Sequence, residues 1–322
     1  MKHISIIIPQ GHYSMVNVEG THQMFSWVNE FMESKGQKPL FKIQLVGLAK
    51  SITQTNGLFT VNPDALIDDV KKTDLIVVPA MHGELQKNIE LNTGLGPWIR
   101  KQYKEGAEIA GFCIAQFFLA STGILNGKSC ATHWRSANEF RKMFPNVTLL
   151  DDKIITECEG IYTSGGAYSF TNLVMYLIEK YAGREAAIVG AKTFMIDIER
   201  NSQSPFIMFV GQKEHKDETV LQAQQYIEHN FKDRLTVDGL ANQLNVGRRT
   251  FERRFKKATS NTVVEYIQRV KIEAAKKQLE TGRKTIAEIM FDVGYTDAKA
   301  FRDVFKKVAG MSPVDYRNRY MG

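Results

Sequence analysis

The chain has 322 residues, of which 43% are hydrophobic and 24% are charged, and this length fits two globular domains better than one. Its longest apolar run, at 4–9, is too short to cross a membrane, and no cleavage site follows it, so neither a membrane span nor a signal peptide is expected. The three cysteines are widely spaced and form no CxxC pair, which argues against a disulfide framework or a zinc site and favours a reduced cytoplasm.

The excess positive charge lies at one end of the chain. From Glu218 onward there are 20 Lys and Arg residues and 13 Asp and Glu residues, a net charge of +7. The whole chain also carries +7, so the residues before Glu218 are neutral as a group. This distribution is typical of a protein whose C-terminal part binds nucleic acid.

Residues 1–190 alternate between the patterns of strands and helices. Residues 3–9 form a continuous apolar run, as in a buried parallel strand. Further strands are expected at 41–46, 74–79, 108–112, 129–132, 147–150 and 154–159, and helices at 16–33, 113–122, 134–144 and 167–181. The alternation predicts an α/β domain with a parallel sheet covered on both faces, and ligands bind such sheets at the carboxyl ends of the strands.

Cys113 is the residue of this domain that most suggests chemistry. It lies where the strand at 108–112 turns directly into a helix, and a helix N-terminus lowers the pKa of a thiol. A nucleophile elbow has this arrangement, and His133, which follows the next short strand, is the corresponding base. His82 follows the third strand, so a ligand pocket of His82, Cys113 and His133 is predicted.

Each of these three residues also has a simpler interpretation. Cys113 is a pocket-lining residue, an inert buried residue or a catalytic nucleophile, in that order of preference. For His133 a structural hydrogen bond is favoured over a catalytic role. For His82 a position in a surface loop is as plausible as one in the pocket.

The segment 111–134, which contains Cys113 and His133, resembles the PfpI/ThiJ family, whose domains have the class I glutamine amidotransferase-like fold. It resembles more closely the amidase-like sensor domain that is fused to AraC-type DNA-binding domains. The resemblance covers about 3–185 and implies a flavodoxin-like three-layer parallel sheet. Active members carry a glutamate after the first strand, where this chain has Val16 or a close neighbour of it, and Glu19 is the nearest carboxylate. The resemblance therefore implies a sensor or dimerisation platform without enzymatic activity, in which Cys113 and His133 are vestigial.

Residues 191–217 are expected to join this domain to a second one at 218–322, with the polar stretch 212–217 as the hinge. The second domain holds two copies of one pattern, at 237–251 and 286–298. Each copy has a short apolar helix, a tight turn and a basic amphipathic helix, which is the pattern of a helix-turn-helix motif. Asn245 and Gly294 stand at the turns, where a positive φ is often needed. The residues expected to face inward are Leu240, Leu244, Phe251 and Phe255 in the first copy and Ile286, Ile289, Phe301 and Phe305 in the second.

The second helix of each copy, at about 248–258 and about 297–308, has a basic outward face. Such side chains suit phosphate contacts, and arginine also reads guanine in the major groove. A solvated charged face is the alternative, but the repetition of the whole pattern disfavours it. The residues expected to contact DNA are Arg248, Arg249, Thr250, Arg253 and Arg254 in the first copy and Asp297, Lys299, Arg302 and Lys306 in the second.

A single long helix is expected between the copies. About 18 residues at a rise of 1.5 Å give roughly 27 Å of helix. A spacer of this length could hold the two basic helices in adjacent major grooves, which repeat every ~34 Å.

The closing run 294–317 resembles the signature of the AraC/XylS family, and the resemblance covers about the last 105 residues. Ala300 replaces the usual aromatic residue before Phe301, and Lys299 stands where a small polar residue is common. These differences concern base preference rather than fold. The resemblance implies an all-α domain with two helix-turn-helix motifs in a bacterial, sequence-specific transcriptional regulator.

The sequence thus predicts a cytoplasmic regulator that is not an enzyme. Its expected partners are double-stranded DNA, a small-molecule effector and a second copy of the chain, and neither a cofactor nor a metal ion is expected. One rival is a Cys-dependent amidase or peptidase fused to a DNA-binding domain. The other is an architectural protein that binds DNA without sensing a ligand.

Overall fold

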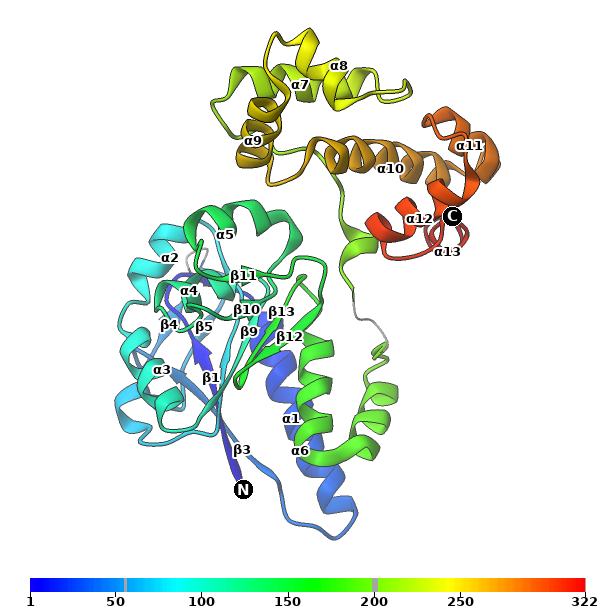
Figure 1. Ribbon diagram of the computed structural model, residues 1–322. Helices are drawn as coiled ribbons and strands as arrows, with labels where there is room; N and C mark the ends of the chain where they lie inside the picture. Colours follow the sequence, from blue (N-terminus) through cyan, green and yellow to red (C-terminus); the bar gives the residue numbers. More distant parts are fainter. Residues whose placement is uncertain (55–56, 199–201, 322) are drawn as a thin grey trace. The chain divides into compact units, whose positions relative to one another are not determined.

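The computed structural model of the protein describes residues 1–54, 57–198 and 202–321 (Figure 1). The chain divides into two compact units, Met1–Gln203 and Ser204–Gly322, and the division falls inside the range 191–217. None of the helices in the described ranges combines the length and the apolar character that crossing a bilayer requires.

The first unit is built around a mainly parallel sheet, which confirms the predicted α/β class. In spatial order the strands are β12 (Ile155–Cys158), β13 (Ile161–Ser164), β9 (Glu108–Phe112), β7 (Leu75–Val78), β1 (Lys2–Ile8), β3 (Phe41–Gly47) and β6 (Ala65–Leu66). The strand β12 pairs antiparallel with β13, whereas the other neighbours are parallel. Strand β1 is apolar because both of its faces are covered: Ile4, Ile6, Ile7 and Ile8 are fully buried.

Helices cover both faces of this sheet. They are α1 (Met15–Ser34), α2 (Leu85–Leu91), α3 (Leu95–Lys104), α4 (Ala115–Ser121), α5 (Ala137–Met143) and α6 (Phe170–Thr193), with 3₁₀ turns η1 (Ile67–Asp69) and η2 (Trp134–Ser136). Figure 1 shows α1 and α6 side by side on one face and α3 and α4 on the other. In the part of the chain that the structure describes, three further sheets have two short strands each: β2 (His12–Tyr13) with β8 (Met81–His82), β4 (Ile52–Thr53) with β5 (Thr60–Val61), and β10 (Ser129–Cys130) with β11 (Thr148–Leu149).

The structure adds α2 and α3, which the sequence patterns did not indicate. Helix α3 carries Gly96 and Pro97 in its first turn, and these residues usually signal a break, although proline is tolerated in the first turn of a helix. Helix α6 is longer than the predicted 167–181 and is kinked at Gly183, whose φ is 87°. Its second leg returns Ala186 and Ala191 to the core of the first unit.

Among the described residues of the second unit, all regular elements are helices. After the 3₁₀ turn η3 (Ser204–Phe206) come α7 (Glu218–His229), α8 (Val237–Gln243), α9 (Arg248–Thr259), α10 (Val263–Thr281), α11 (Ile286–Asp292), α12 (Ala298–Ala309) and α13 (Pro313–Tyr320). The pairs α8–α9 and α11–α12 are the two predicted helix-turn-helix motifs. The turn residues Asn245 and Gly294 have φ values of 52° and 74°, as predicted.

Two separate hydrophobic cores stabilise this unit, one in each half. The first half consists of α7, α8 and α9, and the second of α11, α12 and α13. Helix α10 contributes to both cores: Tyr266 is buried in the first and Leu279 in the second. The predicted inward residues Phe251, Phe255, Phe301 and Phe305 are all at most 1% exposed.

We predict that Gly294→Ala and Gly294→Asn both destabilise the second unit, whereas Asn245→Gly is tolerated. A left-handed φ alone costs a residue with a side chain about 1–2 kcal/mol, and asparagine lowers this cost. A Cβ at position 294 would also lie 2.1 Å from the Lys232 carbonyl oxygen, so asparagine cannot rescue this turn as it does at Asn245.

The measurement is urea unfolding of the full chain followed by far-UV circular dichroism. The three tryptophans, Trp27, Trp98 and Trp134, all lie in the first unit, so fluorescence reports that unit separately. A Gly294→Asn protein as stable as the wild type would contradict the steric argument.

Candidate functional site

Helices α9 and α12 bury and expose their side chains at the same positions, 50 residues apart. Phe251 and Phe255 are buried as Phe301 and Phe305 are, and the exposed positions between them also coincide. Each helix ends at a left-handed residue, Ser260 in α9 and Gly310 in α12. The two motifs are therefore copies in structure as well as in sequence, and each turns one face to solvent.

That solvent face carries most of the residues predicted to contact DNA. The side chains that the structure leaves exposed are Arg248, Arg249, Thr250 and Arg253 on α9, Asp297 at the start of α12, and Lys299, Arg302 and Lys306 on α12. The Asp297 carboxylate accepts a hydrogen bond from the Ala300 amide and so caps α12.

Some of these cations have partners in the same unit. Arg248 pairs with Asp238 (2.8 Å) and with Glu252 (3.6 Å), and Arg302 Nε donates to the Ala298 carbonyl (3.1 Å). The Arg248 side chain is 56% exposed, so its ion pairs are weak and can be exchanged for contacts with a ligand.

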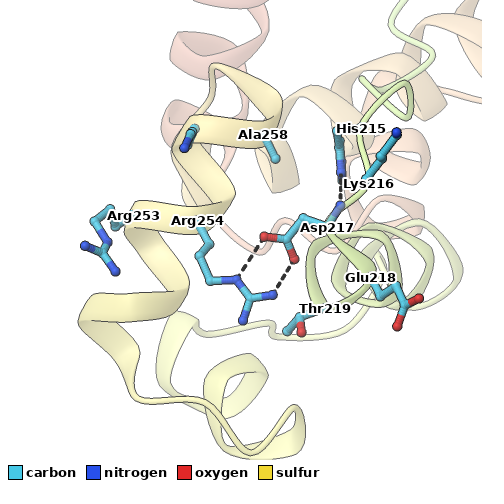
Figure 2. A pocket seen from close by; sticks show the side chains of 9 residues that line it. His215, Lys216, Asp217, Glu218, Thr219, Arg253, Arg254 and Ala258 are labelled. Atoms are coloured by element: carbon cyan, nitrogen blue, oxygen red, sulfur yellow. Dashed lines mark hydrogen bonds and ion pairs between the residues drawn. The ribbon is translucent and has the colours of Figure 1, made fainter.

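Arg254 differs from the other predicted DNA contacts because it is only half-exposed and points into the unit (Figure 2). Its guanidinium donates two hydrogen bonds to Asp217, from Nε at 2.9 Å and from Nη2 at 2.6 Å. These bonds lower the pKa of the Asp217 carboxyl. Asp217 also caps α7, since it accepts from the Val220 amide. The Asp217–Arg254 pair thus fixes α9 against the start of α7.

Two hollows border α9, and both have basic walls. The larger, of about 970 Å³, is lined by His215, Asp217, Arg253, Arg254 and Lys257 among others, and is drawn in Figure 2. The smaller, of about 430 Å³, lies where α9 meets the start of α10 and is lined by Arg249, Lys256 and Thr262 among others. Walls of this charge suit phosphate groups.

In the first unit, Cys113 occupies the predicted elbow between β9 and α4. Its φ is 55°, and its amide donates to the Ser164 carbonyl at the end of the neighbouring strand β13 (2.8 Å). The side chain is 3% exposed. Burial raises the pKa of the thiol to about 11, although the amides of Ile114 and Gly166 donate to the sulfur and oppose the rise. The expectation of a lowered pKa was wrong, because desolvation outweighs the effect of the helix terminus.

His133 belongs to a segment that is bonded to the elbow at Cys113 through the neighbouring residue Thr132. The Thr132 hydroxyl donates to the Cys113 carbonyl (2.9 Å), which brings the two segments together. The His133 ring caps η2, with Nδ1 accepting from the Arg135 amide (3.1 Å). Burial and then the Arg135 charge lower the pKa of His133. A neutral ring that already accepts a hydrogen bond through Nδ1 fits the structural interpretation.

His82 is in β8, which pairs with β2, and its ring lies 5.5 Å from that of His12. Burial and then His12 lower the pKa of His82. Strands β2 and β8 follow the carboxyl ends of β1 and β7, and β7 is adjacent to β9, so His82 and Cys113 lie on the same edge of the sheet. His12 was not predicted from the sequence, although its place directly after the turn at Gly11 could have identified it.

Asn17, a buried polar residue in the first turn of α1, was likewise not predicted from the sequence. Its Oδ1 accepts from the Ala80 amide (3.1 Å), and its Nδ2 is buried without a hydrogen-bond partner among the described residues. Val16 and Glu19 are exposed. The buried side chain is therefore an amide, which cannot act as a general base as a carboxylate does. No group of three or more His, Cys, Asp or Glu side chains within the described ranges is placed to hold a metal ion.

Comparison with known proteins agrees with this division of the chain. The DJ-1/PfpI family profile matches residues 37–180, and the profile of an AraC-type helix-turn-helix domain matches 240–319. The HTH-type transcriptional regulator GbdR of Pseudomonas aeruginosa is 23% identical over 272 residues, which cover 83% of this chain and 72% of that protein. The HTH-type transcriptional regulator CdhR of the same species is 22% identical over 263 residues, covering 81% and 77%.

A solved structure shares the fold of part of the chain. The crystal structure of an AraC family transcriptional regulator from Pseudomonas putida superimposes with a TM-score of 0.50 at 14% identity, and covers 60% of this chain and 100% of that one. The two profiles and the relatives together show a transcriptional regulator in which a DJ-1/PfpI-family domain precedes an AraC-type helix-turn-helix domain.

Proposed function

We propose that the regulator binds two successive major grooves of DNA with α9 and α12. The observation that carries this proposal is the identical burial pattern of the two helices, which leaves a basic face on each. Helix α10 joins them and has 19 residues, or roughly 28 Å at 1.5 Å per residue, close to the ~34 Å repeat of the groove. The proposed DNA contacts are Arg248, Arg249, Thr250, Arg253, Lys299, Arg302 and Lys306.

Two residues that the sequence suggested as DNA contacts receive a different role in this proposal. Arg254 orients α9 through Asp217, and Asp297 caps α12. Both keep a recognition helix in place rather than read a base.

The first unit is proposed to be a small-molecule sensor rather than an enzyme. The carboxyl edge of its sheet combines His12, Asn17, His82, Cys113 and His133, which offer hydrogen bonds to a polar ligand. A thiol with a pKa of about 11 is protonated at neutral pH, and only the thiolate is a strong nucleophile. A ligand at this edge would shift the equilibrium between conformations that present the two helix-turn-helix motifs differently to DNA. We further propose that the regulator acts in the cytoplasm as a homodimer.

The experiment that tests the DNA-binding proposal is selection from a random duplex pool by the purified full chain, followed by titration at several salt concentrations. Enrichment of two motifs about one helical turn apart supports the proposal. Salt-sensitive binding without an enriched motif would instead leave only a general attraction between a basic surface and phosphates.

Arg302→Ala is expected to weaken binding to the selected duplex by about 1–3 kcal/mol and to relax the preference at one base pair. Lys306→Ala is expected to weaken binding to all sequences alike. It should also reduce by about 1 the slope of the logarithm of the binding constant against the logarithm of the salt concentration. Lys101→Ala, an exposed change in the first unit, is the control. Equal loss on specific and random duplexes for Arg302→Ala would exclude base reading by this residue.

Asp217→Asn tests the structural role of Arg254. Asparagine still caps α7, but it loses the charge that attracts Arg254, so we expect a loss of roughly 0.5–1 kcal/mol in the free energy of unfolding at pH 7. Because the folded-state pKa of Asp217 is lowered, its stabilising effect exists above the unfolded pKa of about 3.9 and is lost as the pH falls through the folded value. The wild type and the variant should therefore converge in acid.

The matched control is Asp238→Asn, which breaks the more exposed pair with Arg248 and should change stability less. A constant difference between the wild type and Asp217→Asn at all pH values would argue against the ion pair.

The Cys113 thiol is predicted to react slowly with iodoacetamide at pH 7.5 in a Cys158→Ser protein, and faster as the pH approaches about 11. Because the folded pKa exceeds the unfolded value of about 8.5, the thiol's contribution to stability is present below that pH and is lost as the pH rises through the folded value. Cys113→Ala in the same background is the control. Rapid labelling of one thiol at pH 7.5 that disappears in Cys113→Ala would revive the amidase or peptidase alternative.

A further inference from the structure

The segment 205–217, here called the strap, packs along the second unit instead of forming a free connection. It begins on the second helix-turn-helix half. The Tyr320 hydroxyl donates to the Pro205 carbonyl (3.3 Å), and the Arg319 guanidinium lies 5.0 Å from the centre of the Phe206 ring. Tyr320 and Arg319 both belong to α13, so the strap is attached first to that half.

Two charged residues of α10 hold the middle of the strap. Lys276 Nζ donates to the Ile207 carbonyl and to Glu273 Oε2 (2.9 Å), and the same Glu273 oxygen accepts from the Phe209 amide (3.1 Å). Lys276 is only 3% exposed. A buried ammonium group is costly unless its protons are satisfied, so this lysine depends on the strap and on Glu273.

The strap ends on the first half. Gln224 Nε2 donates to the Gln212 carbonyl (2.8 Å), Gln224 Oε1 lies 3.0 Å from His215 Nε2, and Asn261 Nδ2 donates to Gln212 Oε1 (3.1 Å). The Asp217–Arg254 pair completes this end (Figure 2). The expected hinge at 212–217 thus lies inside the second unit, where Gln212, His215 and Asp217 bind other residues of that unit.

We propose that the strap fixes the orientation of α9 relative to α12, and that Glu273 and Lys276 are its positioning residues. The inference rests on the proposed DNA-binding function. The two halves have separate cores, and α10 joins them together with the loop at 231–233. Phe231 of this loop packs against the second core, and Lys271 Nζ of α10 donates to the Asp233 carbonyl (3.5 Å) and to the Gly294 carbonyl (3.2 Å). The strap contacts both halves and so forms a third connection between them. It also follows closely after Gln203, the last residue of the first unit.

Distance measurements between spin labels test this proposal without DNA. Labels are placed at Asn242→Cys on α8 and Ala287→Cys on α11, two exposed positions in different halves, in a full-length Cys158→Ser protein. In the doubly labelled protein that keeps Glu273 and Lys276, we expect one narrow distribution of distances between the labels. Lys276→Met, which removes the charge that holds Ile207 and Glu273, should broaden it. Lys277→Met, an exposed change at the next position of α10, is the matched control and should not.

Binding to DNA gives the second readout. In unlabelled full-length protein, Lys276→Met should lose about tenfold in affinity for a duplex with two correctly spaced motifs, because the second contact loses effective concentration when the halves are not held rigidly. Its affinity for a duplex with one motif should stay unchanged. Lys277→Met should match the wild type on both duplexes.

If Lys276→Met does not fold, Glu273→Gln tests whether the strap orients the two halves. It keeps an oxygen for the Phe209 amide and removes only the charge that attracts Lys276. A distance distribution as narrow in this variant as in the background protein would overturn the proposal, as would unchanged affinity for the two-motif duplex. If the wild type selects no DNA motif, the proposed function fails, whereas the distance distribution still decides whether the strap orients the halves.

Discussion

Helix α10 is the element on which the second unit depends, because each of its two ends is buried in a different core. Tyr266 packs among the first-half side chains and Leu279 among the second-half ones. Its start is fixed by a capping box in which Thr262 and Glu265 satisfy each other's backbone amides. A shared helix sets the distance between α9 and α12, but rotation of the halves about it must be limited by other segments, and the strap and the loop at 231–233 are placed to do so.

The helix-turn-helix motifs were predictable because local chemistry and packing agree there. The spacing of Phe251 and Phe255, repeated at Phe301 and Phe305, specifies a buried face, and Asn245 and Gly294 specify the turns. The role of Arg254 was not predictable. Its partner Asp217 is 37 positions away in the sequence, and a basic helix pattern does not distinguish a guanidinium that faces solvent from one bound inside the unit. The strap was missed for the same reason, since its polar residues find their partners on distant helices.

In the first unit the sequence identified the elbow at Cys113 but not its electrostatics. The strand-to-helix junction correctly placed the thiol at a helix terminus, where a lowered pKa is expected. Whether the sulfur is also desolvated depends on side chains from other strands, which spacing along the chain does not reveal. Asn17 shows the same limit: position 16 or its neighbour was identified as the place of a missing acid, but only the fold shows that the neighbour is the buried one.

The chain leaves the first unit beside this edge of the sheet. Gln203 Nε2 donates to the Thr132 carbonyl (3.0 Å) and the Lys153 carbonyl (2.8 Å), and the Thr132 hydroxyl in turn donates to the Cys113 carbonyl. The last residue of the first unit is thus two hydrogen-bonded steps from the elbow, and the strap begins two residues later. If a ligand binds at the carboxyl edge, as proposed, displacement of Thr132 would act on Gln203 directly. The proposed ligand edge and the last residue before the strap are therefore linked through Thr132, whose hydroxyl bonds to the elbow and whose carbonyl bonds to Gln203.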